Sequence, residues 1–396
     1  MLAATIAGTS LRGNRVVVTG VGAVTCAGSG ATTLFEALLS GTAPLSRRVP
    51  VFDASHLGGP KELRRLDAFA LYALAAADEA WRQSGLTEPF ENAAAIVATG
   101  IGGLQTLIDQ LAVLTDKGPG RVSPFMIPSM MPNAGAAAVS MRFGLRGPCE
   151  TITTACAAGT HAVGAAARLI ATGRVDVAVC GGSEAVMVPV AAAGFANMTA
   201  LSNEGISRPF DRDRDGFVMG EGGGALVLER YEHAVARGAT ILAELVGAAS
   251  TADAHHITAP DPTGAGAIDC MRRALADAEL QPADVDHINA HGTSTPLNDR
   301  AEALAVSSVF GNRRIPVTSV KGYLGHSLAA AGALEAVVSV LTITNSLIPP
   351  TAGTRHVDPE VALDVVLEPR AFEGDVVLSN SFGFGGHNGS LVFRRC

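Results

Sequence analysis

Cys156 is the residue of this sequence best suited to act as a covalent nucleophile. It lies in segment 154–159 (TACAAG), between a β-capable stretch at 150–154 and a run of small residues at 157–171 that predicts a helix. At such a strand-to-helix turn, unpaired N–H groups and the helix dipole favour a thiolate. A thiolate attacks thioesters, and small neighbours leave room for an acyl chain and a pantetheine arm. The alternative is a buried, inert thiol.

His291 is the first of two histidines with a setting suited to catalysis. It follows the apolar run 285–290, which predicts a strand, and precedes a tight loop that begins at Gly292. The carboxyl ends of strands in α/β sheets are where ligands usually bind. Thr293 and Thr295 place hydroxyls in this loop, where they can bind an amide-rich arm. A lone histidine in an apolar chain is otherwise mostly structural.

The second setting joins Lys321 and His326 in the run KGYLGH. The pattern predicts a strand at 316–320 and an Ala-rich helix at 326–344, so His326 is expected at a helix N-terminus. Backbone N–H groups there keep an imidazole neutral, with its other N–H free to donate. Lys321 is expected to raise the local positive potential or to pair with a carboxylate such as Glu302. The structural alternative is a surface lysine beside a capping histidine.

Segment 380–389 (NSFGFGGHNG) is too rich in glycine for an ordinary strand. Glycine permits positive φ and close backbone approach. Such a loop can direct a backbone N–H into a site, as an oxyanion hole requires. A plain turn is the alternative, and the phosphate-loop pattern GxxxxGK[ST] does not occur in the sequence.

The elements expected to position these residues alternate between strands and helices, which predicts a layered α/β fold. The strands are mostly apolar without alternation, as in sheets covered on both faces. Residues 1–238 and 239–396 show strand–loop–helix units in similar order, so we predict two similar halves around one core. The further expected strands are 15–20, 94–98, 175–182, 241–247, 376–380 and 390–393, and the helices are 32–39, 66–84 and 264–278.

Composition restricts the function further. Of 396 residues, 48% are hydrophobic and 17% are charged, which is typical of a well-buried globular protein. The net charge of −8 argues against general nucleic-acid binding. No zinc-type cysteine spacing, cleavable leader or long apolar span is evident, so we expect no metal, no membrane and a reducing cytoplasm. We assign no role to Cys26, Cys149, Cys180, Cys270 or Cys396.

Four segments in one order, 154–159, 291–295, 321–326 and 380–386, closely resemble the elongating β-ketoacyl-acyl-carrier-protein synthases of bacterial fatty-acid and type II polyketide synthesis. The resemblance extends from Val16 to Phe393. It implies a thiolase fold, a five-layered αβαβα core of two similar halves, built as a dimer. It implies no cofactor, because the substrates are carried on the phosphopantetheine of acyl carrier protein.

The resemblance also implies roles. Cys156 accepts the acyl chain, and the backbone N–H groups of Cys156 and Phe384 form the oxyanion hole. His291 and His326 assist the loss of CO₂ from malonyl carrier protein and stabilise the enolate, which then attacks the acyl thioester. The other residues implied for the site are Lys321, the supporting Glu302, the pantetheine-contacting Thr293 and Thr295, Phe382 beside the substrate, and Ile101 and Met126 lining the acyl pocket, the latter across the dimer.

Two departures from the family pattern bear on the partner. The chain is shorter than usual between Phe52 and Leu66, by roughly one loop or helical turn. The basic cluster Lys61, Arg64 and Arg65 remains there to receive an acidic carrier protein. Thr199 stands where a carrier-docking arginine is common. Together with Met126, where a bulkier aromatic is frequent, the short region favours type II polyketide or polyene-type secondary metabolism.

Several alternatives stay open. One alternative to secondary metabolism is a housekeeping fatty-acid elongation synthase. Another is the catalytic subunit of a heterodimer with a chain-length-factor partner. A non-enzymatic chain-length factor would usually lack the nucleophile. A cysteine hydrolase would be expected to have a Cys–His–Asp set. A thiolase, or a condensing enzyme that starts chains from coenzyme A, is less consistent with His291, Lys321 and His326.

Overall fold

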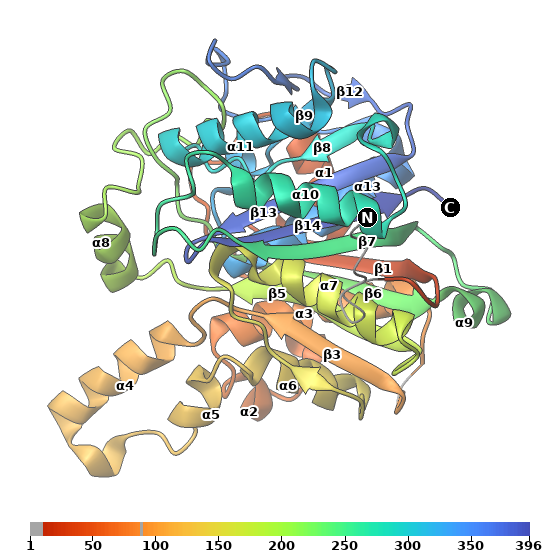
Figure 1. The fold of residues 1–396 in the computed structure, drawn as a ribbon. Coiled ribbons are helices and arrows are strands. Elements are labelled where there is room, and N and C mark those ends of the chain that lie inside the picture. The colour runs from red at the N-terminus through yellow and green to blue at the C-terminus, as the bar shows by residue number, and fades with distance from the viewer. Residues whose placement is uncertain (1–10, 88–89) are drawn as a thin grey trace.

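Two half-sheets join through β1 (Val16–Thr25) and β7 (Ala243–Ala252), which pair antiparallel near Val18 and Ala243. The structure is a computed structural model that describes residues 11–87 and 90–396 (Figure 1). The N-terminal half-sheet has the order β4 (Cys149–Glu150), β3 (Ala93–Ala98), β5 (Val177–Glu184), β6 (Gly222–Arg230) and β1. The C-terminal half-sheet has the order β9 (Pro316–Thr318), β8 (His287–Asn289), β13 (Val376–Gly383), β14 (His387–Arg394) and β7, with β11 (Asp364–Val365) beyond β9.

The two half-sheets have the same topology. In the N-terminal half-sheet, β3 runs parallel to β4 and β5, and β6 pairs antiparallel with β5 and β1. In the C-terminal half-sheet, β8 runs parallel to β9 and β13, and β14 pairs antiparallel with β13 and β7. The predicted arrangement of two similar halves therefore appears in the strand order, although no sequence repeat reveals it. The boundary predicted after residue 238 falls in the loop before β7, and it stays a prediction.

Helices α7 (Ala158–Ala171) and α13 (Ala329–Asn345) form the central layer and pack on each other and on both half-sheets. Their contact is close because small residues face one another: a Cβ on Gly159 would lie 2.6 Å from the carbonyl oxygen of Ala329. The outer layers are α3 (Ala68–Ser84) with α6 (Ala134–Phe143) on the N-terminal half-sheet, and α10 (Ala265–Asp277) with α11 (Pro296–Phe310) on the other.

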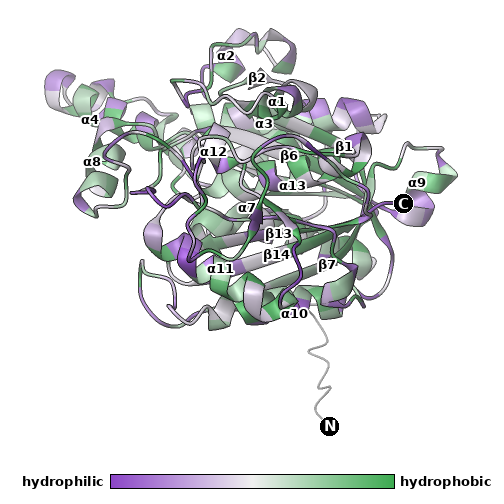
Figure 2. Cartoon of the chain, turned by 90° about the horizontal axis from the view of Figure 1, so that it is seen from above, coloured by the Kyte–Doolittle hydropathy of each residue, from purple (hydrophilic) through white to green (hydrophobic). Residues whose placement is uncertain are grey.

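Two helices, α4 (Leu104–Lys117) and α8 (Pro189–Asn197), project from one side of the molecule (Figures 1 and 2). None of the α4 side chains is buried, although the helix is amphipathic. No helix among the described residues is long and apolar enough to cross a membrane. The smaller elements are β2 (Gly28–Ser29), α1 (Ala31–Leu39), α2 (Pro60–Leu63), α5 (Met126–Met130), α9 (Tyr231–Ala236), α12 (Lys321–Leu324), β10 (Leu347–Ile348) and β12 (Arg370–Ala371).

Three predictions differ from the structure beside the site. Segment 380–389, expected to be too rich in glycine for an ordinary strand, lies mostly in β13 and β14, and only residues 384–386 form the turn between them. The β-capable stretch at 150–154 is a strand only as far as Glu150, because β4 is an edge strand and pairs only with β3. The helix predicted to start at His326 begins at Ala329. His326 instead forms an isolated parallel bridge with Met219, a tertiary contact that the local sequence does not encode.

Candidate active site

Cys156 lies in a 3₁₀ turn (Ala155–Ala157) that leads directly into α7. The preceding Ala155 has a φ of +50°, an unusual value for a residue with a side chain, and such strain is common at functional turns. The thiol is buried, with 5% of the residue exposed. Burial raises the pKa of Cys156 to about 11, opposed by the charge of Lys321 and by the backbone N–H of Phe384. The thiolate is therefore not the resting form, contrary to the expectation from the helix N-terminus.

The turn between β13 and β14 provides the hydrogen-bond donors that face Cys156. The backbone N–H of Phe384 donates to the thiol sulfur. A Cβ on Gly383 would lie 3.0 Å from the backbone nitrogen of Cys156, so this approach depends on glycine. The backbone N–H groups of Cys156 and Phe384 thus both lie at the sulfur, as the predicted oxyanion hole would require.

His161, which the sequence analysis left without a role, connects the nucleophile turn to this hairpin. Its Nδ1 lies 2.7 Å from the hydroxyl of Thr154, and its Nε2 lies 3.0 Å from the carbonyl oxygen of Asn388. Because a carbonyl only accepts, Nε2 carries the proton and Nδ1 accepts from Thr154. Burial lowers the pKa of His161, which favours this neutral form.

His291 and His326 face each other across the site. Their ring centroids are 5.5 Å apart and nearly perpendicular. Both side chains are buried, and burial, assisted by the positive charge of Lys321, holds both pKa values well below the usual range. Phe217 lies against His326 and Phe382 against His291, at centroid distances of 5.3 and 5.9 Å. Both imidazoles are therefore neutral and able to donate a hydrogen bond to a developing negative charge.

The setting of His326 differs from the expected helix N-terminus. Its backbone N–H donates to the carbonyl of Val218, at 2.7 Å, and its carbonyl accepts from Gly220, at 2.9 Å. The ring Nδ1 is buried and has no hydrogen-bond partner within residues 11–87 and 90–396. The ring is therefore positioned by its backbone and by Phe217 rather than by helix N–H donors.

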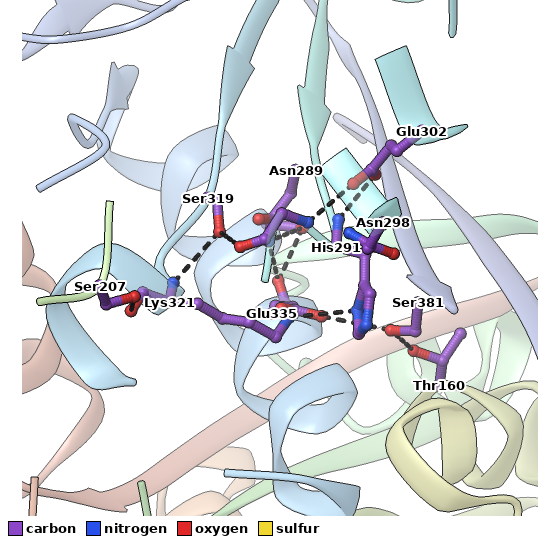
Figure 3. Close-up of polar contacts among 12 residues, drawn as sticks. Thr160, Ser207, Asn289, His291, Asn298, Glu302, Ser319, Lys321, Glu335 and Ser381 are labelled. Carbon is purple, nitrogen blue, oxygen red and sulfur yellow. Dashed lines mark hydrogen bonds and ion pairs between the residues drawn. The ribbon is translucent and has the colours of Figure 1, made fainter. Parts of the chain in front are cut away.

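The partner of Lys321 is Glu335, not Glu302 (Figure 3). The ammonium also lies 3.2 Å from Nδ1 of His291. Glu335 comes from the buried face of α13, and its second oxygen accepts from Ser381 at 3.2 Å. A buried lysine needs such an acidic partner, since an isolated charge in the interior is very costly.

Glu302 instead holds the backbone of the His291 loop. Its two oxygens accept the N–H groups of His291 and Gly292 at 2.8 and 2.7 Å. Burial raises the pKa of Glu302 to about 8, opposed by these two hydrogen bonds. Glu302 is thus a positioning residue for the loop that carries His291.

One cavity opens from the surface to Cys156. His291, His326, Phe382 and Phe384 line it beside the thiol. Thr293 and Thr295 also line it, and their hydroxyls lie 2.8 Å apart. Further lining residues, which the sequence analysis did not assign to the site, include Asp253, Phe195, Met198, Asn298 and Leu328.

Other predicted residues lie away from this cavity. In the single described chain, Ile101 and Met126 are not among its lining, and Ile101 is 42% exposed. Lys61, Arg64 and Arg65 are exposed on and after α2, also outside the lining. The guanidinium of Arg65 stacks 4.0 Å above the ring of Phe125.

Comparisons with known proteins place both halves of the chain in one family. Residues 45–234 match the family described as Beta-ketoacyl synthase, N-terminal domain, and residues 242–355 match Beta-ketoacyl synthase, C-terminal domain. The 3-oxoacyl-[acyl-carrier-protein] synthase 2 of Synechocystis sp. is 44% identical over 98% of this chain and 99% of its own.

Two solved structures are similar over nearly the whole chain. A chain of the ishigamide ketosynthase/chain length factor has a TM-score of 0.92 and 34% identity, over 97% of this chain and 100% of its own. A chain from the complex of a type II polyketide synthase acyl-carrier protein with its ketosynthase has a TM-score of 0.88 and 31% identity, over the same shares.

These similarities confirm the predicted thiolase-type α/β fold and the predicted class of acyltransferase. They extend across both half-sheets, and so include the segments that carry Cys156, His291 and His326. The chain therefore belongs to the β-ketoacyl synthase family.

Proposed function

We propose that the chain is a β-ketoacyl-[acyl-carrier-protein] synthase that carries out decarboxylative Claisen condensation. The observation that carries this proposal is one cavity lined by a buried thiol and two neutral histidines, with backbone N–H groups facing the thiol. A cysteine hydrolase would need only one histidine, oriented by an acid. Two neutral imidazoles suit an enolate, whose oxygen accepts hydrogen bonds but takes no proton.

The first half-reaction moves the acyl group onto Cys156. The thiol loses its proton to an imidazole of the pair, and the sulfur attacks the carbonyl carbon of the carrier thioester. The resulting oxyanion accepts the N–H groups of Cys156 and Phe384. When it collapses, the bond to the pantetheine sulfur breaks, and that thiol leaves with the proton.

The second half-reaction forms the carbon–carbon bond. In malonyl carrier protein the bond to the carboxylate carbon breaks, CO₂ leaves, and the electron pair forms an enolate whose oxygen accepts from His291 and His326. The enolate carbon attacks the acyl carbonyl, the Cys156 thiolate leaves, and a proton from the solvent returns it to the thiol. Lys321 and Glu335 form a net neutral pair, so the ammonium can polarise His291 without adding an unpaired charge to the site.

Acyl carrier protein is the proposed partner. Thr293 and Thr295 line the cavity and offer hydroxyls to the amides of a phosphopantetheine arm, the group proposed to carry the substrates. A related ketosynthase was solved in complex with its acyl-carrier protein. Lys61, Arg64 and Arg65 are exposed and are proposed to receive the acidic carrier.

A second subunit is proposed to cover the projecting arm around α4 and α5. Leu111 and Leu114 on α4 are 51% and 44% exposed, which is costly for an amphipathic helix in water. Ile101 lies just before α4, and Met126 is the first residue of α5. Since both are proposed to line the acyl pocket, a partner that covers this arm would complete the pocket. The partner is a second copy or a chain-length-factor-like subunit; a ketosynthase/chain length factor is among the similar structures.

For the pathway, we propose type II polyketide or polyene-type secondary metabolism. The short region 52–66 and Met126 at the acyl-pocket position support it. Fatty-acid elongation is the second candidate, favoured by 44% identity to the Synechocystis 3-oxoacyl-[acyl-carrier-protein] synthase 2.

The deciding experiment incubates the protein with acyl- and malonyl-carrier protein, alone and with a candidate partner subunit. We expect mass spectrometry to find the acyl group on Cys156 and a β-ketoacyl product. Cys156→Ala should abolish both, whereas Cys270→Ala, which removes another buried thiol with a pKa of about 11, should abolish neither. Unchanged acylation and product with Cys156→Ala would overturn the proposal.

A further inference from the structure

Glu184 is a fully buried carboxyl group for which the proposed chemistry has no use. It ends β5, and none of the residue is exposed. Burial raises the pKa of Glu184 to about 7, opposed by the donors around it. An interior carboxyl group is costly unless its oxygens are hydrogen-bonded, so these donors indicate what the residue does.

The donors come from two separate segments. One carboxylate oxygen accepts the hydroxyl of Thr99, at 3.1 Å, and the N–H of Ile101, at 3.3 Å. The other accepts the N–H of Gly100, at 2.8 Å, and that of Ala329, at 3.3 Å. Glu184 therefore ties the turn after β3, in the N-terminal half, to the first residue of α13, in the C-terminal half.

Close backbone packing makes this connection rigid. A Cβ on Gly100 would lie 2.7 Å from the Glu184 carboxylate, and a Cβ on Gly182 would lie 2.7 Å from the carbonyl oxygen of Ala329. Neither segment has room to shift towards the other, so the carboxylate fixes their separation.

Each segment adjoins a residue that bears on the proposed acyl site, although only one of the two, Leu328, lines the cavity of the single chain. Leu328, directly before Ala329, lines the cavity and packs in the same buried cluster as Cys156. Its φ of +47° is unusual for leucine, so its backbone needs external support. On the other side, Ile101 is the residue proposed to line the acyl pocket.

We propose that Glu184 is a positioning residue that sets the acyl-chain selectivity of this enzyme, by holding the backbone of Ile101 and that of Ala329, which follows the cavity residue Leu328, at a fixed separation. The inference rests on the proposed ketosynthase function. We expect selectivity to be affected, because an acyl pocket distinguishes chains of different length only while its lining residues keep their positions.

The test is Glu184→Gln, which keeps the side-chain size but replaces one acceptor oxygen with an NH₂ group. One pair of N–H or O–H donors then loses its acceptor. We expect kcat/KM, measured over a series of acyl carrier proteins of increasing chain length, to vary less with chain length. The ratio between the best and the poorest substrate should fall about tenfold.

Ser183→Ala is the matched control. It changes the neighbouring residue of β5, whose buried hydroxyl has no hydrogen-bond partner within the described part of the chain. We expect it to leave the ratio unchanged. Thr99→Val removes one donor to Glu184 with little change of shape, and it should shift the ratio in the same direction by a smaller factor.

Two results would overturn the inference. In the first, Glu184→Gln changes neither the rates nor the ratio. In the second, it lowers the rate by the same factor for all chain lengths, so that the ratio is again unchanged. If the unmodified protein condenses no acyl chain at all, the proposed function fails instead, so the two failures are distinguishable. Should Glu184→Gln not fold, as judged from its melting temperature, an unchanged ratio with Thr99→Val would overturn the inference.

Discussion

In each half of the molecule, a loop that faces the cavity connects a strand to a central helix: β4 to α7 in the N-terminal half, and β9 to α13 in the C-terminal half. The two loops differ in structure. After β4 a single 3₁₀ turn leads into α7 and carries Cys156. After β9 the chain forms α12 and a bridge to Met219 before α13 begins, and this longer path carries Lys321 and His326. One topology thus provides a tight turn for a nucleophile and a longer loop for electrostatic groups.

The two loops also differ in charge. Burial in a cluster that includes Phe217, Met219 and Leu328 raises the pKa of the Cys156 thiol, although the charge of Lys321 opposes this shift. The C-terminal loop brings Lys321 and Glu335 into the interior as an ion pair beside His291. The nucleophile therefore depends on the opposite half for a proton acceptor.

The largest effect is expected from His326→Asn. The change removes one hydrogen-bond donor to the proposed enolate but leaves the thiol and the oxyanion hole intact. Condensation should fall by about 10³-fold, within the range for losing one acid–base or oxyanion group. Acylation of Cys156, followed by mass spectrometry, should fall much less, because His291 remains to accept the thiol proton. Equal losses in both half-reactions would contradict the division between the two halves.

Lys321→Met should combine a stability effect with an activity effect. It leaves Glu335 buried without its cationic partner, which costs about 3–5 kcal/mol of unfolding free energy. Denaturant unfolding measures this loss. The double variant Lys321→Met with Glu335→Gln should recover most of the stability but not the condensation rate, since His291 still lacks its neighbouring charge. Full recovery of both would assign the pair a purely structural role.

The sequence predicted the site where it is built from short local patterns. His291 and Lys321 each follow an apolar stretch, and Cys156 follows a β-capable stretch rich in threonine, so a loop after a strand is evident from residue types alone. Partners that come from distant helices were not evident. Glu335 was missed although a signal existed: it is the single charged residue of a 17-residue apolar helix, and a carboxylate there must have a partner.

Longer-range contacts explain the remaining differences. The start of α13 at Ala329 depends on the bridge between His326 and Met219, which lie far apart in the sequence. The role of His161 likewise depends on Asn388, which reaches it only when the β13–β14 hairpin packs on α7. The half-sheet topology was predicted only as two similar halves, because strand order follows from tertiary packing rather than from local pattern.

His161→Leu should have an intermediate effect, because it cuts the connection between the nucleophile turn and the hairpin. The hydroxyl of Thr154 and the carbonyl of Asn388 would both lose their partner, at a cost of about 1–3 kcal/mol. The Phe384 N–H would then be less well placed, so acylation should slow more than condensation of a preloaded enzyme. His161→Gln, which can still donate to Asn388, should restore part of the acylation rate; no difference between the two variants would contradict this role.

The smallest effect concerns the titration of the thiol. Since burial raises the pKa of Cys156 to about 11, the thiolate fraction should rise about tenfold for each pH unit across the neutral and mildly basic range. His291 and His326 do not titrate there, because their pKa values lie well below the usual range. The rate of iodoacetamide alkylation at Cys156, followed by peptide mass spectrometry, should therefore rise along a single slope up to the pH at which the protein unfolds. A plateau near neutral pH would mean that the C-terminal half already holds the thiol as a thiolate, and the two halves would then share the activation of the nucleophile before any substrate binds.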